Sequence, residues 1–242
     1  AVNNVSFDVK DGEVISLIGE SGSGKSTIGK MILGLISISS GMIRLNGVDI
    51  ATLKGRALKD YYRNVQGVFQ DPFSSYNPIF KADRIFRIIR EEFFPKINNR
   101  EWDKKIDSSL RAVGLNPDEV LNKYPHQLSG GQLQRFLIAR ALLLDVSTQK
   151  AVAKMLVEFR DREFVKSLIV ITHDISILYQ IAGSIMIMYA GKLAEKASTE
   201  AIINSPLHPY TKLLISSLPD IGIKYSQKKL TGIPGKPPLL LD

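Results

Sequence analysis

The sequence contains no cysteine, one tryptophan and three histidines. Without cysteine, the chain cannot form disulfides, thiolate metal sites or iron–sulfur clusters. No apolar run approaches the roughly eighteen residues that a transmembrane helix needs, and no basic start followed by an apolar stretch resembles a signal peptide. Internal repeats and low-complexity tracts are also missing. These absences exclude a membrane-spanning, disulfide-stabilised or repeat protein and predict a globular chain of the cytoplasmic type.

The composition is that of an ordinary globular protein. The 242 residues are 44% hydrophobic and 23% charged, which is close to the average for such proteins. The length corresponds to between one and two domains. Thirty-two basic and 24 acidic residues give a net charge of +8, which permits a nucleic-acid or membrane-surface partner without demanding one.

Alternating apolar segments and turn signals predict an α/β core. Strands are expected at residues 2–9, 14–18, 43–45, 65–69, 167–172 and 185–189. Helices are expected at 27–35, within 81–113, after residue 128 and at 210–218, with a hairpin-like turn at 190–191. The residues near 72–144 therefore form a helical insertion in the predicted α/β core.

Residues 19–26 fit the pattern G-x-x-x-x-G-K-[ST] between a predicted strand and a predicted helix. The glycines let the backbone curl so that its N–H groups point at a β-phosphate. Lys25 can reach between the β- and γ-phosphates, the Ser26 hydroxyl can bind Mg²⁺, and the helix N-terminus favours an anion. A plain Gly/Ser turn needs neither the Lys-Ser pair nor a helix that begins directly behind it. The pattern predicts nucleoside triphosphate binding by Gly19, Glu20, Ser21, Gly22, Ser23, Gly24, Lys25, Ser26 and Thr27.

Three further motifs occur in a defined order. Residues 128–132 (L-S-G-G-Q) resemble the signature sequence of ABC ATPases, Gln70 matches the family's Q-loop glutamine, and His173 matches its switch histidine. Each has an ordinary explanation by itself: a serine that caps a helix, a surface glutamine and a structural histidine. Their joint order identifies the chain as a member of the ABC ATPases.

The resemblance implies a P-loop NTPase fold whose α/β core carries an antiparallel β subdomain and a helical signature subdomain. It implies one ABC ATPase domain, with the nucleotide-binding core at residues 1–71 and 145–200, the helical subdomain at 72–144 and a C-terminal extension at 201–242. The cofactors are ATP and Mg²⁺, with Ser26 and Gln70 near the metal. Gln70 and His173 are the catalytic candidates. Two subunits pack head-to-tail, so that further nucleotide contacts come from Ser129, Gly130, Gly131, Gln132 and Asp145.

The C-terminal region narrows the resemblance. Residues 206–211 (P-L-H-P-Y-T) resemble the fingerprint of ATP-binding subunits of oligopeptide and dipeptide importers, and residues 69–78 are similar to that subgroup. This implies ATP hydrolysis at the cytoplasmic face of the membrane, together with a second ATPase subunit, transmembrane permease subunits and, indirectly, a substrate-binding protein. Nucleic acid is not an expected partner. Some members carry oligosaccharides, so the cargo stays open. For His208, we favour a proline-flanked turn without a ligand.

Ten of the nineteen aromatic residues fall between Tyr61 and Trp102. This density favours the core of the helical subdomain. Because residues 73–94 directly follow Gln70, they are also the expected groove for a cytoplasmic helix of the permease.

Two other classes of protein fit the sequence less well. An ABC protein of DNA repair or translation would suit the positive charge, but repair members insert long coiled coils and translation members usually carry two cassettes. This chain has one cassette and no sustained heptads. A P-loop kinase or a purely structural nucleotide binder would not need the signature, Gln70 and His173 together.

One expected strand is missing from the sequence. ABC ATPases carry an apolar strand ending in Asp-Glu soon after the signature helix, whereas residues 139–144 here run directly into Asp145, which resembles the start of the D-loop. Roughly a dozen residues are absent. Because a parallel sheet would hardly survive the loss of a central strand, we favour a skipped segment over a natural deletion. We expect a break between Leu144 and Asp145 and an open position beside the strand that carries the phosphate loop.

Overall fold

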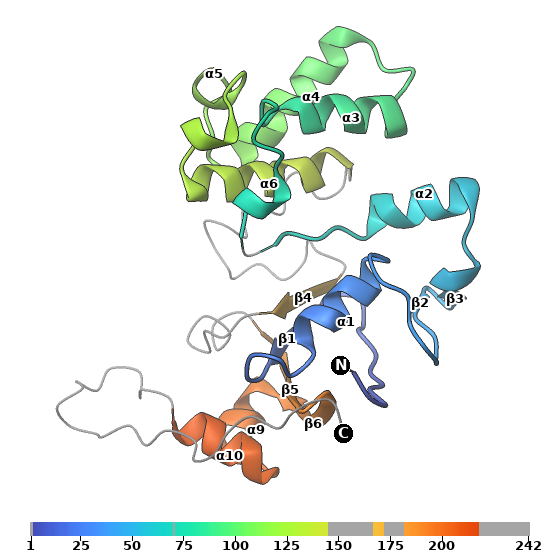
Figure 1. The fold of residues 1–242 in the computed structure, drawn as a ribbon, viewed down its shortest axis with the longest axis vertical. Helices are drawn as coiled ribbons and strands as arrows, with labels where there is room; N and C mark the ends of the chain where they lie inside the picture. Colours follow the sequence, from blue (N-terminus) through green and yellow to red (C-terminus); the bar gives the residue numbers. More distant parts are fainter. Residues whose placement is uncertain (1, 70, 145–166, 172–181, 218–242) are drawn as a thin grey trace, which may run out of the picture. The chain divides into compact units, whose positions relative to one another are not determined.

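The computed structural model of the chain describes residues 2–69, 71–144, 167–171 and 182–217. The chain folds into two compact units (Figure 1). The first contains residues 1–36 and 166–242, and the second contains residues 37–165. The first unit is therefore assembled from both ends of the chain, whereas the second is one continuous segment.

The described strands of the first unit form one sheet in the order β4-β1-β5-β6. Strand β1 (Glu13–Ile18) pairs in parallel with β4 (Ser167–Ile171) on one side and with β5 (Ser184–Tyr189) on the other. Strand β6 (Lys192–Ser198) is antiparallel to β5. The hairpin predicted at residues 190–191 is confirmed, and the continuous apolar runs of β1 and β5 are typical of parallel strands covered on both faces.

Helices cover both faces of this sheet. Helix α1 (Lys25–Ile32) packs on the face that carries Ile15, Leu17, Met186 and Met188. Helices α9 (Thr199–Asn204) and α10 (Pro209–Ser216) pack on the opposite face, against Ile18, Ile185 and Ile187. Successive side chains of a strand point to opposite faces, so β5 supplies both cores in alternation. The phosphate loop joins β1 to α1 at one end of this sheet.

The second unit is mainly helical. It begins with a short hairpin of β2 (Arg44–Leu45) and β3 (Val48–Asp49), whose turn residues Asn46 and Gly47 both have positive φ, as a tight two-residue turn requires. The α-helices that follow are α2 (Gly55–Asn64), α3 (Arg84–Phe93), α4 (Asn99–Ala112), α5 (Pro117–Val120) and α6 (Gly130–Leu144). Short 3₁₀ turns lie at Ile50–Thr52, Phe73–Ser75 and Pro125–Gln127.

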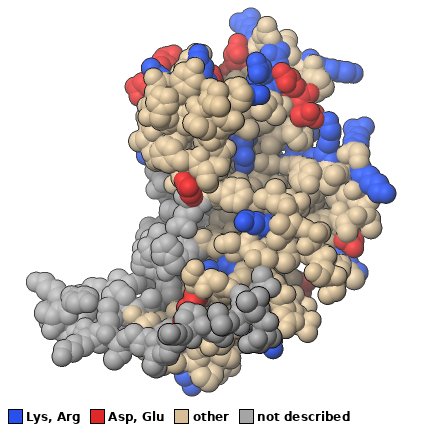
Figure 2. Space-filling model, in the orientation of Figure 1, with Lys and Arg blue, Asp and Glu red and all other residues tan. Residues whose placement is uncertain are grey.

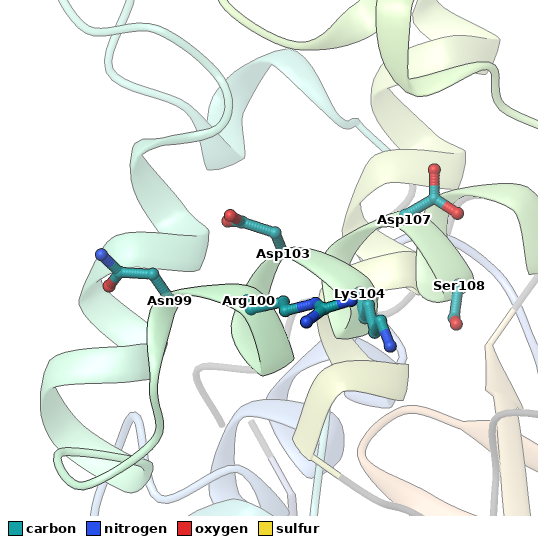
Figure 3. Close-up of a pocket in the computed structure, with 6 residues that line it drawn as sticks. All are labelled: Asn99, Arg100, Asp103, Lys104, Asp107 and Ser108. Carbon is teal, nitrogen blue, oxygen red and sulfur yellow. The ribbon is translucent and has the colours of Figure 1, made fainter.

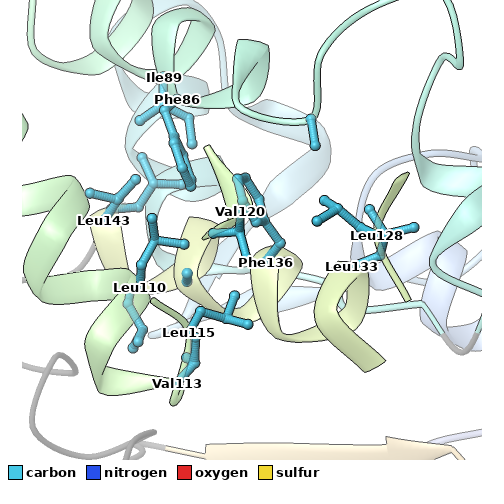
Figure 4. Close-up of a cluster of buried hydrophobic side chains, with 14 of the residues drawn as sticks. Phe86, Ile89, Leu110, Val113, Leu115, Val120, Leu128, Leu133, Phe136 and Leu143 are labelled. Atoms are coloured by element: carbon cyan, nitrogen blue, oxygen red, sulfur yellow. The ribbon is translucent and has the colours of Figure 1, made fainter. Parts of the chain in front are cut away.

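Helices α3, α4 and α6 share one apolar core (Figure 4). Phe86 of α3 and Phe136 of α6 stack with ring centroids 4.8 Å apart, and both are almost fully buried. Leu110 and Trp102 of α4 are buried in the same cluster. Much of the aromatic density between Tyr61 and Trp102 therefore serves the core of this unit, as one of the two interpretations predicted.

Three structural expectations are wrong. Residues 2–9 and 65–69 form no strand. Val2, Val5, Phe7 and Val9 pack against the core beside α1 without pairing in the sheet. The open position does not lie beside β1, because β1 has strand neighbours on both sides; among the described strands, β4 forms that edge. The expected break at Leu144–Asp145 falls outside the described residues.

Candidate nucleotide-binding site

The phosphate loop leaves β1 at Gly19 and enters α1 at Lys25. Gly19, Gly22 and Gly24 have φ of 151°, 83° and 101°, conformations that other residues rarely adopt. A Cβ on Gly19 would also lie 2.1 Å from the carbonyl oxygen of Met188 in β5. Two conditions thus require glycine at Gly19: the backbone conformation and the close approach of the neighbouring strand.

The Lys25 ammonium is held inside the loop by neutral acceptors. Its Nζ donates to the carbonyl oxygens of Gly19 (2.7 Å) and Glu20 (2.6 Å) and to Ser23 Oγ (3.2 Å). In the part of the chain that the structure describes, no carboxylate lies within ion-pair distance of this ammonium. Burial lowers the pKa of Lys25, although the nearby Glu20 charge opposes this effect. A partly desolvated cation with only neutral partners can bind an incoming phosphate.

The start of α1 is open to an anion as well. The first N–H groups of an α-helix have no partner within the helix, and Gly24, the residue at its N-cap, supplies no side-chain cap. Ser26 lies exposed in the first turn, and Thr27 follows it half-buried. The curled backbone, the lysine and the uncapped helix end together fit a triphosphate.

Two contacts from the C-terminal part of the first unit support the loop. The Gly191 N–H donates to the Ser23 carbonyl oxygen (3.2 Å), and the Glu20 N–H donates to the Tyr210 hydroxyl oxygen (3.2 Å). Sequence reasoning did not assign either residue to the site. The signal was present in the P-L-H-P-Y-T segment, which was interpreted only as a subgroup marker.

The signature residues of the second unit begin α6. Ser129 and Gln132 form reciprocal bonds, in which the Gln132 N–H donates to Ser129 Oγ (3.2 Å) and the Ser129 N–H donates to Gln132 Oε1 (2.8 Å). This arrangement is a capping box, the ordinary explanation given above for that serine. Ser129 is exposed, and its hydroxyl proton is not used in this box.

Within the described residues, the fold does not require glycine at the two glycine positions of the signature. A Cβ on Gly131 would meet nothing within 4 Å, and one on Gly130 would lie at an ordinary 3.6 Å from the Phe73 ring. Neither residue has positive φ. Among the described residues, no atom stands in the way of a side chain at either position.

Gln70, Asp145 and His173 lie outside the described residues, so their predicted roles stay predictions. A shallow hollow on the described part of the chain lies away from these motifs and is lined by Asn99, Arg100, Asp103, Lys104, Asp107 and Ser108 (Figure 3). All six residues belong to α4, and Asp107 already pairs with Arg111 at 3.0 Å. The hollow is the open face of one helix and holds no candidate residue.

Comparisons with known proteins agree with the motifs. The ABC transporter family model matches residues 2–148, and the model of the oligopeptide/dipeptide transporter C-terminal region matches residues 194–242. The dipeptide transport ATP-binding protein DppF of Lactococcus lactis is 39% identical over 258 aligned positions, which cover all of this chain and 82% of the relative. The oligopeptide transport ATP-binding protein OppF of Streptococcus mutans is 38% identical over 91% of this chain and 75% of its own length.

Solved structures confirm the fold. The dimeric ATP-binding cassette MJ0796 bound to ADP and Pi superposes with a TM-score of 0.68 at 27% identity, covering 82% of this chain and 90% of that chain. A second dimeric structure of MJ0796 gives a TM-score of 0.66 at 26% identity, with the same coverage of both chains. The chain therefore belongs to the ATP-hydrolysing ATP-binding proteins of ABC transporters, in the oligopeptide/dipeptide importer subfamily.

Proposed function

We propose that the phosphate loop binds MgATP and that the chain hydrolyses it within a head-to-tail dimer to energise the import of peptides. The observation that carries this proposal is the Lys25 ammonium, which is held by three neutral acceptors beside the uncapped start of α1. A triphosphate can bring charged oxygens to this ammonium in place of its longest neutral contact, Ser23 Oγ at 3.2 Å, and charged oxygens bind a lysine more strongly.

The residues of the loop contact different parts of the nucleotide. Lys25 contacts the β- and γ-phosphates, while the backbone N–H groups from Gly22 to Thr27 surround the β-phosphate. Mg²⁺, when bound, neutralises charge on the same phosphates; Ser26 is the predicted ligand within the described residues, and Gln70 is the second predicted ligand. His173 is proposed to contact the γ-phosphate and stabilise the charge that develops in the transition state.

The signature of a second subunit completes the site. The capping box at the start of α6 does not use the hydroxyl proton of Ser129. Among the described residues, nothing requires Gly130 or Gly131 to be glycine. Both features suit a γ-phosphate that approaches α6 from another subunit, with Gln132 and Asp145 beside it. The related cassette MJ0796 is dimeric in its solved structures. The partner is a second copy or a homologous ATPase subunit.

Exposed apolar side chains in the second unit support a permease contact. Large apolar residues near Gln70 in the sequence remain exposed, although Phe86 within the same stretch is buried; the exposed ones are Val68, Phe69, Phe73, Ile79 and Phe80. Ile79 has 75% of its surface exposed. Groups of exposed apolar side chains are typical of surfaces that bind other proteins. We propose that they receive a cytoplasmic helix of a transmembrane subunit.

Location and cargo follow from that assembly. Among the described helices, none has the length and apolarity to cross a bilayer, so the permease would hold the chain at the cytoplasmic face of the membrane. The names of the relatives, which are peptide transport proteins, favour a peptide delivered by a substrate-binding protein.

A nucleic-acid function is the alternative. On the face shown in Figure 2, Lys and Arg side chains are interspersed with Asp and Glu across the described atoms. Such mixing suits a solvated surface better than a track for a phosphate backbone. The salt dependence of any DNA binding separates the two classes, because a repair protein would show a steep slope.

The test is reconstitution with the neighbouring membrane subunits. We expect co-purification with the permease and ATP hydrolysis that is stimulated by peptide together with the substrate-binding protein. A variant with Lys25→Met serves as the control for background ATPase. A chain that binds nucleic acid with a steep salt slope and fails to associate with the permease would overturn the proposal.

A further inference from the structure

The Tyr210 hydroxyl lies against the phosphate loop although 190 positions separate it from its partner Glu20. Its oxygen accepts the Glu20 N–H at 3.2 Å. That N–H belongs to the peptide unit between Gly19 and Glu20, and the carbonyl of the same unit accepts Lys25 Nζ at 2.7 Å. Because a peptide unit is planar and trans, its N–H and C=O point in opposite directions. Tyr210 and Lys25 therefore hold the two ends of one rigid plane.

Gly19 itself contributes little to holding this peptide unit in place. Gly19 has φ of 151° and no side chain that would restrict its backbone torsions. A rotation would turn the Gly19 carbonyl away from Lys25 and release the ammonium from one of its three acceptors. The bond to Tyr210 opposes that rotation.

The position of Tyr210 is itself fixed by the residues around it. The Glu195 carboxylate on β6 accepts the N–H groups of Leu207 (2.9 Å) and His208 (3.0 Å). His208 Nδ1 then accepts the Tyr210 N–H (3.1 Å), so His208 caps α10. Burial raises the pKa of the Glu195 carboxyl, but the two N–H bonds, together with the Thr211 side chain and the His208 charge, lower that pKa overall.

The ring of Tyr210 is also held. It is 6% exposed, belongs to the apolar cluster of β5 and α9, and lies 4.4 Å from the ring of Tyr189 between centroids. Tyr189 ends β5, directly before the turn whose Gly191 N–H donates to Ser23. Burial and the Glu20 charge raise the pKa of Tyr210, so its phenol stays neutral beside a site for a highly charged anion.

We propose that Tyr210 is a positioning residue for the phosphate loop, through which the segment from Leu207 to Tyr210 sets the affinity of the loop for nucleotide. Tyr210 acts by orienting the Gly19–Glu20 peptide and, through it, Lys25. The effect on affinity rests on the proposed function of the loop. The P-L-H-P-Y-T segment thus has a structural task at the nucleotide site.

The test compares Tyr210→Phe with Tyr189→Phe. Each removes one hydroxyl from the same ring pair, but within the described residues only the Tyr210 hydroxyl bonds to the loop. In the full chain without nucleotide, we expect faster hydrogen exchange of the Glu20 amide in Tyr210→Phe and no change in Tyr189→Phe. The dissociation constant for ATP should rise about five-fold, the value of one typical hydrogen bond, in Tyr210→Phe alone.

Steady-state kinetics of the assembled importer separate positioning from a general loss of structure. A looser loop binds the ground state and the transition state more weakly by the same amount, so KM for ATP should rise while kcat is retained. Partial unfolding would lower kcat and leave KM unchanged. Unaltered Glu20 exchange in Tyr210→Phe, or equal effects of both variants, would overturn the proposal. If the wild-type chain binds no nucleotide, the proposed function fails, while the exchange experiment still decides the positioning.

Discussion

A methyl group at Gly19 is expected to damage the phosphate loop through β5. The Cβ of Gly19→Ala would lie 2.1 Å from the Met188 carbonyl oxygen and 2.8 Å from Ser23 Oγ, far inside the ordinary contact range that begins at 3.4 Å. The Met188 carbonyl cannot move away at low cost, because β5 is paired on both sides. Overpacking of about 1–3 kcal/mol adds to a backbone strain of about 1–2 kcal/mol. The free energy of unfolding of the first unit should therefore fall by about 2–5 kcal/mol.

Gly22→Ala is the matched control. Gly22 has φ of 83°, but a Cβ there would meet nothing within 4 Å. The free energy of unfolding of this variant should fall only by the cost of the backbone strain, about 1–2 kcal/mol. The sole tryptophan, Trp102, lies in the second unit, so its fluorescence would not report on the loop. Hydrogen exchange of the β1 and β5 amides measures the stability of the first unit, which contains the loop. Equal losses in the two variants, or undiminished nucleotide affinity in Gly19→Ala, would refute the reasoning.

Three further outcomes are expected. Lys25→Met should reduce ATP affinity at least about tenfold, because charged hydrogen bonds contribute about 1.5–3 kcal/mol, yet leave the circular dichroism spectrum unchanged; calorimetric titration measures the first. Gly131→Ala should retain wild-type stability but lose ATPase in the assembled transporter, and retained ATPase would show that no partner closes on that glycine. Phe86→Ala should cost the second unit about 3–5 kcal/mol by opening a cavity beside Phe136, measured by urea denaturation, whereas Phe80→Ala, at an exposed ring, should cost below about 1 kcal/mol.

The parts of the site that depend on local sequence could be predicted. The order strand, glycine loop and helix around Lys25 is encoded within about twenty residues, because glycine conformations and helix starts are local properties. The signature serine was also assigned correctly to a helix start, since Ser129 and Gln132 have the spacing of a capping box. The hairpin turn at residues 190–191 follows from the same local chemistry.

The long-range contacts of the loop could not be predicted in this way. Nothing near Gly19 in the sequence indicates that the Met188 carbonyl approaches it, or that Tyr210 accepts the next N–H. These contacts depend on the parallel pairing of β1 with β5 and on the helix start fixed by His208. A motif search assigns residues that touch the ligand, whereas residues that hold those residues in place become visible only after folding.

The absent strand at residues 65–69 and the open edge at β4 have one physical explanation. Residues 65–69 have the sequence of a strand, but no described strand pairs with them, and Val68 and Phe69 remain exposed. Strand β4 has the apolar sequence of a central parallel strand, yet its residues are half-buried or exposed, while β1 beside it is mostly buried. Strand formation depends on a neighbour that supplies hydrogen bonds and covers apolar faces.

Inserting a strand after Leu144 is expected to protect β4, whose outer edge has no partner among the described strands. An inserted apolar strand ending in Asp-Glu can pair with that edge of β4. The matched control is a Gly/Ser insertion of equal length, which lengthens the chain but cannot form a buried strand. Hydrogen exchange at residues 168–171 should slow in the first variant only, because ladder bonds protect amides from solvent. ATPase should rise with it, since the inserted carboxylates would support Mg²⁺ and the attacking water. If the β4 amides exchange at the same rate in both insertion variants, β4 does not lack a strand at its outer edge.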